Sequence, residues 1–253
     1  MIDKELVKRH FSKSAREYED IARIQRYVAN ELVLKIPERD YRSILDVGCG
    51  TGLLPHLLSK RFPLAMITGV DIAAGMVEVA NNNKSHMNLI FQVGDGESLS
   101  FSDASFDLVV SSSSFQWMNV VKAFSEVKRV LLPGGKFVFA CFASNTLREI
   151  KEVFGAGSVH DLPSSELVIS TLAALEFSNI EVVTTAKREY YPNAFDLLKT
   201  LKQLGVQNAQ KRGVGLGGGR SIFRSMVEYE EQFSGSNGVY ATYEVVYGLA
   251  LKY

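Results

Sequence analysis

A glycine-rich turn after a short apolar run is the part of the sequence best suited to chemistry. Residues 43–47 read SILDV and residues 46–52 read DVGCGTG. Glycine lets a backbone turn sharply and approach a ligand closely, and the first N–H groups of a following helix can bind a polar group. A dinucleotide-binding GxGxxG turn would need a glycine at position 53, where Leu53 stands. The GxGxG spacing therefore favours a ligand with an amino-acid moiety over one with a pyrophosphate.

Acidic side chains follow the next two apolar runs. Asp71 ends the run at 65–71, where its carboxylate could accept hydrogen bonds from both hydroxyls of a ribose. Asp95 and Glu97 follow the run at 89–94, and an acid there could accept a hydrogen bond from the amino group of an adenine. Each acid alone is also typical of a helix cap or a turn. Their order predicts a nucleoside site at one edge of a sheet.

A parallel sheet is needed to position these residues. Near-continuous apolar runs predict strands at 43–47, 65–71, 89–94, 106–111 and 136–142, as expected for parallel strands that are covered on both faces. Two further strands, at 181–190 and 243–251, would close the sheet as an antiparallel pair.

Helices are predicted by apolar residues at three- and four-residue spacing. Positions 21, 24, 28, 29 and 32 predict an amphipathic helix before the first strand, which would be a flank or a lid. A helix before the fifth strand should bury Val121, Phe124, Val127, Val130 and Leu131 and should end at the PGG of 133–135. Helices at 195–204 and 221–233 are expected before the last strand, joined by a glycine-dense connection.

Composition is that of an ordinary globular α/β domain. The chain has 253 residues, and its 28 Lys and Arg balance its 28 Asp and Glu, which argues against bulk attraction to nucleic acid or to an anionic membrane. No apolar stretch has the length of a signal peptide or a membrane span, so a cytoplasmic protein is expected. Cys49 and Cys141 have no CxxC neighbours and the four histidines are scattered, so neither a metal site nor a disulfide framework is expected.

The nucleotide-site residues resemble those of the class I S-adenosylmethionine-dependent methyltransferases. The resemblance covers 45–52, Asp71, Gly94 with Asp95, 106–110 and 132–135. It implies a Rossmann-like α/β fold, with a mostly parallel seven-stranded sheet, helices on both faces and a helical insertion before the last strand. It also implies S-adenosylmethionine as cofactor. The residues that it places at the cofactor are Gln25, Asp46, Gly48, Gly50, Gly52, Asp71, Ile72, Met76, Gly94, Asp95, Gly96, Glu97, Ser112 and Phe115.

Outside this core, the chain resembles the malonyl-acyl-carrier-protein O-methyltransferases of biotin synthesis, the BioC family. The matching stretches are 10–11, Ala15 with Tyr18, 24–25, 115–117, 146–149, 198–205, 221–224 and 241–243. The resemblance implies methyl esterification of the free carboxylate of a malonyl thioester, which masks its charge so that the fatty-acid machinery can extend the chain toward pimelate. Acyl carrier protein or coenzyme A would carry the malonyl group.

This chemistry calls for positioning groups more than for a general base, because a carboxylate is already ionised at neutral pH. Tyr18, Gln25 and Trp117 are candidates to close over the cofactor and the acceptor. Lys202 or Arg224 could hold the acceptor's carboxylate by a charge-assisted hydrogen bond. We therefore expect Tyr18, Trp117, Lys202 and Arg224 as catalytic residues and no metal.

The organisation expected is one methyltransferase domain over 1–253. A helical flank or lid would occupy 1–40, the cofactor-binding core 41–143 and a substrate-side helical insertion 190–235. Clustered cations near the N-terminus and at 199–224, Lys211 and Arg212 among them, could dock an acidic carrier protein. Alternatives remain open, namely methylation of another small acid or of a quinone ring, an S-adenosylmethionine-binding regulator without catalysis, and a nicotinamide oxidoreductase, against which Leu53 counts.

Overall fold

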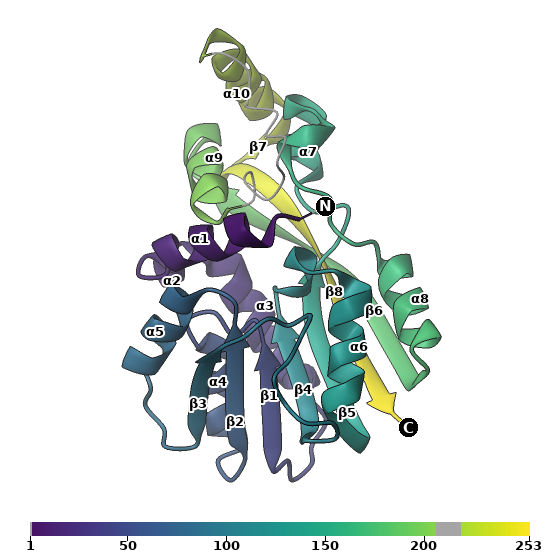
Figure 1. Cartoon of the computed structure of the whole chain (residues 1–253). Helices are drawn as coiled ribbons and strands as arrows, with labels where there is room; N and C mark the ends of the chain where they lie inside the picture. Colours follow the sequence, from purple (N-terminus) through teal and green to yellow (C-terminus); the bar gives the residue numbers. More distant parts are fainter. Residues whose placement is uncertain (1, 206–218) are drawn as a thin grey trace.

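A mostly parallel sheet forms the centre of the protein. The computed structural model describes residues 2–205 and 219–253, and within them the strand order is β3-β2-β1-β4-β5-β8-β6 (Figure 1). The strands are β1 (Ser43–Val47), β2 (Met66–Asp71), β3 (Leu89–Val93), β4 (Phe106–Ser112), β5 (Leu131–Phe142), β6 (Phe177–Tyr191), β7 (Ser234–Gly235) and β8 (Gly238–Lys252). The first five are parallel, whereas β8 runs antiparallel between β5 and β6 and also pairs with β7.

The strand order sets the place of the site. The chain runs outward from β1 to β3 and then returns to β4 on the other side of β1, so the loops after β1 and β4 diverge. Such a switch point opens a crevice at the carboxyl ends of the strands, where ligands of α/β proteins bind. The turns after β1, β2, β3 and β4 all meet at this edge, which is the upper end of these strands in Figure 1, below α1.

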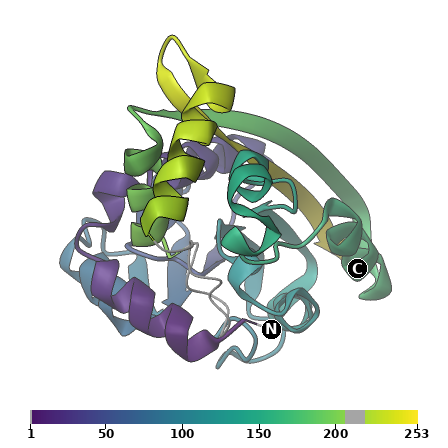
Figure 2. The same cartoon turned by 90° about the horizontal axis from the view of Figure 1, so that it is seen from above.

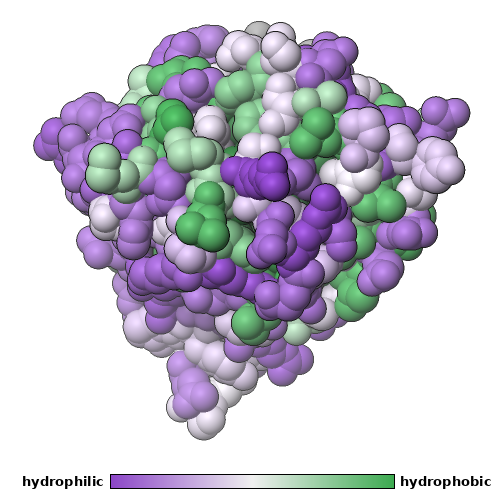
Figure 3. All heavy atoms as spheres, turned by 90° about the horizontal axis from the view of Figure 1, so that it is seen from below, coloured by the Kyte–Doolittle hydropathy of each residue, from purple (hydrophilic) through white to green (hydrophobic). Residues whose placement is uncertain are grey.

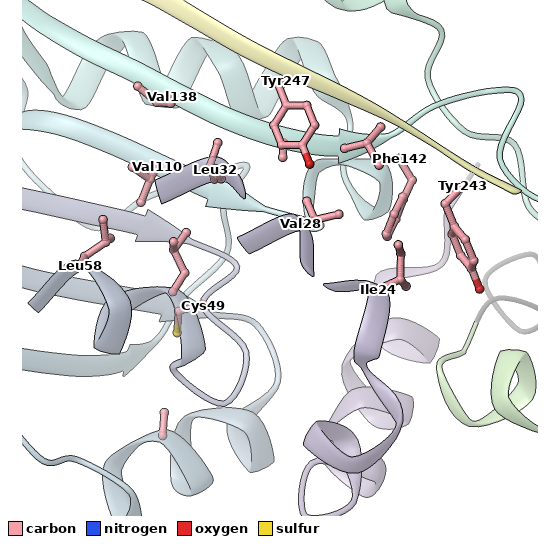
Figure 4. Close-up of a cluster of buried hydrophobic side chains, with 14 of the residues drawn as sticks. Ile24, Val28, Leu32, Cys49, Leu58, Val110, Val138, Phe142, Tyr243 and Tyr247 are labelled. Carbon is pink, nitrogen blue, oxygen red and sulfur yellow. The ribbon is translucent and has the colours of Figure 1, made fainter. Parts of the chain in front are cut away.

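Helices cover both faces of the sheet. One face packs against α3 (Arg23–Lys35), α4 (Leu53–Arg61) and α5 (Ala74–Asn82), and the other against α6 (Val120–Val130) and α8 (Ser165–Ala174). Because side chains alternate along a strand, Val138 joins the first core and Phe137 the second. Figure 4 shows Ile24, Val28 and Leu32 along the side of α3 that packs on the sheet, and all three are buried.

The remaining helices gather over the carboxyl edge. They are α1 (Lys4–Ser14), α2 (Tyr18–Ile21), α7 (Arg148–Phe154), α9 (Ala194–Gln203) and α10 (Gly219–Phe233) (Figures 1 and 2). Helix α1 lies between α5 and α9. A Cβ added at Gly75 of α5 would stand 2.4 Å from the carbonyl oxygen of Ser12, and the ring of His10 donates from Nε2 to the carbonyl of Gln203 at 2.9 Å. These contacts hold α1 between α5 and α9.

The predicted fold class is confirmed, and most element bounds agree within a few residues. The helix before β5 differs. It ends at Val130, and Leu131 already belongs to β5, where it pairs with Phe106. The PGG sequence lies inside β5, with Gly134 at φ +74°, in a ladder whose register shifts between Phe106 and Leu108. Val121 is 52% exposed, because Val120 and Ala123 take the buried positions of α6.

In the view from below, at the opposite end of the sheet, apolar side chains lie among hydrophilic ones (Figure 3). Two exposed apolar residues, Leu64 and Met87, belong to the turns that precede β2 and β3. Scattered apolar side chains are normal on a protein surface. In the part of the chain that the structure describes, no helix is both long and apolar enough to cross a membrane.

Gly69 of β2 lies in close contact with Cys49 of the glycine turn, and a substitution at Gly69 tests how tightly the two segments pack. A Cβ added at Gly69 would stand 2.8 Å from Cβ of Cys49 and 2.8 Å from the ring of Phe91. Gly69→Ala should therefore lower the free energy of unfolding by about 1–3 kcal/mol, the usual cost of overpacking, as measured by urea denaturation. Gly235→Ala is the matched control, because an added Cβ there meets nothing within 4 Å. Equal midpoints for the two variants would contradict this account.

Candidate active site

A large cavity opens at the carboxyl edge beneath α1. Its volume is about 970 Å³ with its mouth included, which lies within the range of small-molecule sites. The structure brings most of the predicted cofactor residues to its wall. They are Gln25, Asp46, Gly48, Gly50, Asp71, Ile72, Met76, Gly94, Asp95, Gly96 and Ser112. These residues come from α3, α5 and the ends of the first four strands.

The glycine turn forms the floor of this cavity. Gly48, Gly50 and Gly52 have φ of +78°, +53° and +92°, a backbone region that side chains disfavour. The N–H groups of Gly48 and Cys49 donate to the carbonyl of Val70 at 2.8 and 2.9 Å, which fixes the turn against the end of β2. A Cβ added at Gly50 would meet nothing within 4 Å, so this glycine leaves its side of the cavity open.

Two buried carboxylates stand beside the turn. Asp71 accepts hydrogen bonds from the N–H of Gly50 at 2.9 Å and the N–H of Ala73 at 2.8 Å. Burial raises the pKa of Asp71, and these two N–H groups oppose that rise. Asp46 is 1% exposed, and its Oδ1 has no hydrogen-bond partner among the described residues. Burial raises the pKa of Asp46 well above its usual value, and the nearby charge of Asp71 adds to the rise.

The end of β3 is tied to the N-terminal helix. Nζ of Lys4 lies 2.7 Å from Oδ2 of Asp95 and 2.9 Å from Oε2 of Glu97. Glu97 also accepts a hydrogen bond from the N–H of Asn119. Asp95 lines the cavity, as expected, whereas Glu97 does not and instead joins the loop after β3 to α1 and to the start of α6.

A second, smaller cavity adjoins the first. Its volume is about 460 Å³ with its mouth included. Five residues line both cavities, namely Phe11, Tyr18, Gln25, Ser113 and Trp117. The rest of its wall consists of Gln116, Phe142, Thr146, Leu147, Val159, His160, Leu162, Leu204 and Tyr243. Within the described ranges, no lysine, arginine, aspartate or glutamate lines this cavity.

Aromatic rings form the wall at the junction. The ring of Phe11 lies edge-on to those of Trp117 and Tyr18, with centroids 5.4 and 6.0 Å apart, and Trp117 stacks on His160 at 4.3 Å. Burial raises the pKa of Tyr18, and the charge of Asp71 raises it further, so the phenol keeps its proton at neutral pH. Tyr18 can therefore donate a hydrogen bond at the junction.

Three predicted cofactor residues lie elsewhere. Phe115 is fully buried in the second core, with its ring edge-on to those of Phe124 and Phe137, because the turn after β4 directs its side chain away from the cavity. Gly52 packs between helix and sheet, since an added Cβ would stand 3.0 Å from the ring of Phe91. Glu97 is engaged by Lys4, as described above.

The predicted carboxylate-binding cations are also elsewhere. Lys202 and Arg224 are exposed, on α9 and α10, and neither lines either cavity. Helix α9 turns Leu197, Leu198 and Leu201 inward, which leaves Lys202 outside. Lys211 and Arg212, expected to dock a carrier protein, lie outside the described residues.

Sequence reasoning did not identify Ser113, Gln116 and His160 as site residues. For Ser113 the sequence did contain a signal, because the predicted strand at 106–111 ends in the first of four consecutive serines, at the carboxyl edge of the sheet. His160 carried no such signal, since it lies in a loop far along the chain.

Comparison with known proteins agrees with this geometry. A family model described as a methyltransferase domain matches residues 45–139, which include the glycine turn, Asp71 and Asp95. The malonyl-[acyl-carrier protein] O-methyltransferase of Geobacter sulfurreducens is 37% identical over 268 residues, which cover 100% of both chains.

Solved structures show the same fold at low identity. The YcgJ protein of Bacillus subtilis has a TM-score of 0.67 and 18% identity, with 89% of this chain and 98% of that chain covered. Geranyl diphosphate C-methyltransferase of Streptomyces coelicolor, in complex with Mg²⁺, geranyl diphosphate and S-adenosyl-L-homocysteine, has a TM-score of 0.57 and 14% identity, with 89% and 78% covered. The full-length match at 37% identity identifies the family: this chain is an S-adenosylmethionine-dependent class I methyltransferase and belongs to the malonyl-[acyl-carrier protein] O-methyltransferase family.

Proposed function

We propose that this protein methylates the free carboxylate of a malonyl group that is carried on acyl carrier protein. The observation that carries the proposal is the pair of adjoining cavities, one with buried carboxylates and one whose wall has no lysine, arginine, aspartate or glutamate in the described ranges. The name of the Geobacter relative supports the choice of acceptor. The ester product would serve biotin synthesis, as the family resemblance implies.

The larger cavity suits S-adenosylmethionine. Oδ1 of Asp46, buried and without a partner among the described residues, would accept a hydrogen bond from the ammonium of the methionine part. Asp71 would bind the ribose hydroxyls, since its carboxylate is already oriented by two N–H groups. Asp95 would lie at the adenine. When bound, this cofactor supplies an electrophilic methyl group on a sulfonium.

The smaller cavity suits the acceptor. An ionised carboxylate attacks without a general base, so the residues here need to bind it, orient it and exclude water. The rings of Phe11, Tyr18 and Trp117 stand where the two cavities meet and would shield the reacting atoms. Attraction between a carboxylate and a sulfonium is stronger in such a water-poor site than in solution.

Exposed cations at the rim support a carrier protein as the thioester handle. Lys8, Arg9, Lys13 and Arg16 are all exposed on or just after α1, the helix that covers the larger cavity. Acyl carrier proteins are acidic, so a cationic rim would steer one toward the mouth. Coenzyme A is the alternative carrier of the malonyl group, and the mass measurement described next compares the two carriers directly.

The acceptor can be tested by intact-mass measurement. Malonyl-acyl carrier protein incubated with S-adenosylmethionine and the enzyme should gain the mass of one methylene, because one methyl replaces one charge-balancing proton. Acetyl-carrier protein is the control, since it lacks the free carboxylate and should stay unchanged. Malonyl-coenzyme A in parallel compares the handles. Cofactor binding without methylation of either malonyl thioester would instead indicate another acceptor or a regulator.

Replacement of Asp71 tests the ribose assignment. Asp71→Ala should weaken binding of S-adenosylhomocysteine by about 1–3 kcal/mol, the range for lost hydrogen bonds to a charged group, as measured by calorimetric titration. Asp40→Ala is the control, because Asp40 is exposed and does not line the cavity. Unchanged affinity in Asp71→Ala would place the ribose elsewhere.

The pKa of Asp46 predicts opposite effects on binding and stability. S-adenosylhomocysteine affinity should fall as pH falls through the raised pKa of Asp46, because only the ionised carboxylate attracts the ammonium. Without cofactor, stability should fall as pH rises between the ordinary and the raised pKa, because the folded state then holds the proton more tightly than the unfolded state.

Asp46→Asn should therefore flatten the pH dependence of binding. It should weaken affinity at neutral pH while raising the melting temperature of the cofactor-free protein. Titration calorimetry across pH and thermal melts would measure both. A variant that keeps the wild-type pH dependence of binding would show that another group receives the ammonium.

A further inference from the structure

The four serines at the carboxyl end of β4, residues 111–114, have two different roles in the structure. The outer two fasten β4 to β1 and to the glycine turn. Oγ of Ser111 donates to the carbonyl of Val47 at 2.7 Å, and Oγ of Ser114 donates to the carbonyl of Gly48 at 2.9 Å. A Cβ added at Gly48 would stand 2.2 Å from Oγ of Ser114, so the two segments are in direct contact. The two serines between them are thereby held at the cavity wall.

Ser113 is held in an unfavourable backbone conformation. Its φ is +57°, in the left-handed region that non-glycine residues seldom adopt. Its N–H donates to the carbonyl of Ala140 at 2.8 Å, and its own carbonyl accepts a hydrogen bond from Nε2 of Gln116 at 2.6 Å. Such conformations cost free energy and persist where the surroundings enforce them, which is common at binding sites.

The hydroxyl of Ser113 is buried and unused. Among the described residues, its Oγ has no hydrogen-bond partner, although a buried hydroxyl usually has one. Ser113 lines both cavities, whereas Ser112, whose Oγ is also buried without a partner in the described ranges, lines only the larger one. A donor at the junction therefore faces the place where the two substrates of a methyl transfer must meet.

No unpaired lysine or arginine lines either cavity in the described part of the chain. The smaller cavity has no lysine or arginine in its wall there, and the lysine of the larger cavity, Lys4, is paired with Asp95 and Glu97 and does not line the smaller one. The donors that line both cavities are neutral, namely the hydroxyl of Ser113, the phenol of Tyr18, the side-chain amide of Gln25 and the indole N–H of Trp117. Among these donor atoms, Oγ of Ser113 is the one that is buried without a hydrogen-bond partner in the described ranges.

We propose that Ser113 is the specificity-determining residue for the acceptor's carboxylate, which it holds through its hydroxyl at the junction with Tyr18 as a second neutral donor. This inference rests on the proposed function. One carboxylate oxygen accepts from Ser113 while the other attacks the methyl carbon. The O–CH₃ bond forms, the S–CH₃ bond breaks, and its electron pair stays on sulfur. Ser113 keeps its proton throughout.

Neutral donors have a chemical advantage here. A cation beside the carboxylate would compete with the sulfonium for its charge and lower its nucleophilicity, whereas a hydroxyl orients the group and leaves the sulfonium as its counter-charge. The same contact would distinguish the ionised substrate from the methyl ester product. A hydrogen bond to an ionised acceptor is stronger than one to a neutral ester, so the product is held less tightly than the substrate.

Two substitutions at Ser113 separate the hydroxyl from the backbone. Ser113→Ala removes the hydroxyl and keeps the unfavourable φ, whereas Ser113→Gly removes both. Each should raise KM for malonyl-acyl carrier protein about tenfold or more, the range for one hydrogen bond to a charged group, and leave the affinity for S-adenosylhomocysteine unchanged. Each should also lose most of the preference for malonyl- over acetyl-carrier protein in binding competition. Ser113→Gly should melt at or above the wild-type temperature.

Ser112→Ala is the matched comparison, because it removes a buried hydroxyl one residue away that faces only the larger cavity. It should weaken S-adenosylhomocysteine binding and leave the malonyl preference intact. The assignment is overturned if both Ser113 variants keep the wild-type KM and malonyl preference, or if they lose cofactor affinity as strongly as acceptor affinity. A wild-type enzyme that methylates no malonyl thioester would overturn the proposed function itself, and that result is visible before any variant is compared.

Discussion

Buried negative charge at the carboxyl edge of the sheet is the constraint on which the site depends. Asp46 and Asp71 stand in one cavity, and an unpaired buried carboxylate is costly. The N–H groups of Gly50 and Ala73 stabilise Asp71, but Asp46 keeps an oxygen without a partner in the described ranges. In the free protein this unpaired oxygen is therefore unfavourable, and a cationic ligand that pairs with it would gain affinity by removing that cost.

The two cavities differ in the charged side chains that line them. The larger one concentrates carboxylates, which suits a ligand with an ammonium and a sulfonium, while the wall of the smaller one contains no lysine, arginine, aspartate or glutamate in the described ranges. Charged side chains in the smaller cavity as well would compete with the attraction between the sulfonium of the cofactor and the carboxylate of the acceptor. The strand order makes this division possible, because the loops after β1 and β4 diverge from one switch point and place the serines of β4 between the two spaces.

Sequence reasoning succeeded where structure is local. The turn after β1 and the acids after β2 and β3 are fixed by their own strands, so their meeting at one edge followed from the order of elements alone. It failed where tertiary packing decides. Phe115 follows the same strand end as Ser113, yet one side chain enters the core and the other reaches the cavity. Lys202 could have been placed better, since the leucines of α9 define an inward stripe that excludes it.

Strand β6 has a consequence for the behaviour of the folded protein at high concentration. It spans fifteen residues at the end of the sheet order, pairs with β8 along one side, and so presents a long row of backbone groups to any other chain. In its second half it carries Lys187 and Arg188, whose cations lie over the rings of Tyr27 and Tyr240 at 4.6 and 4.3 Å. Successive charges on opposite faces oppose the stacking of a second copy against this edge, so the strand that completes the sheet also guards it against aggregation.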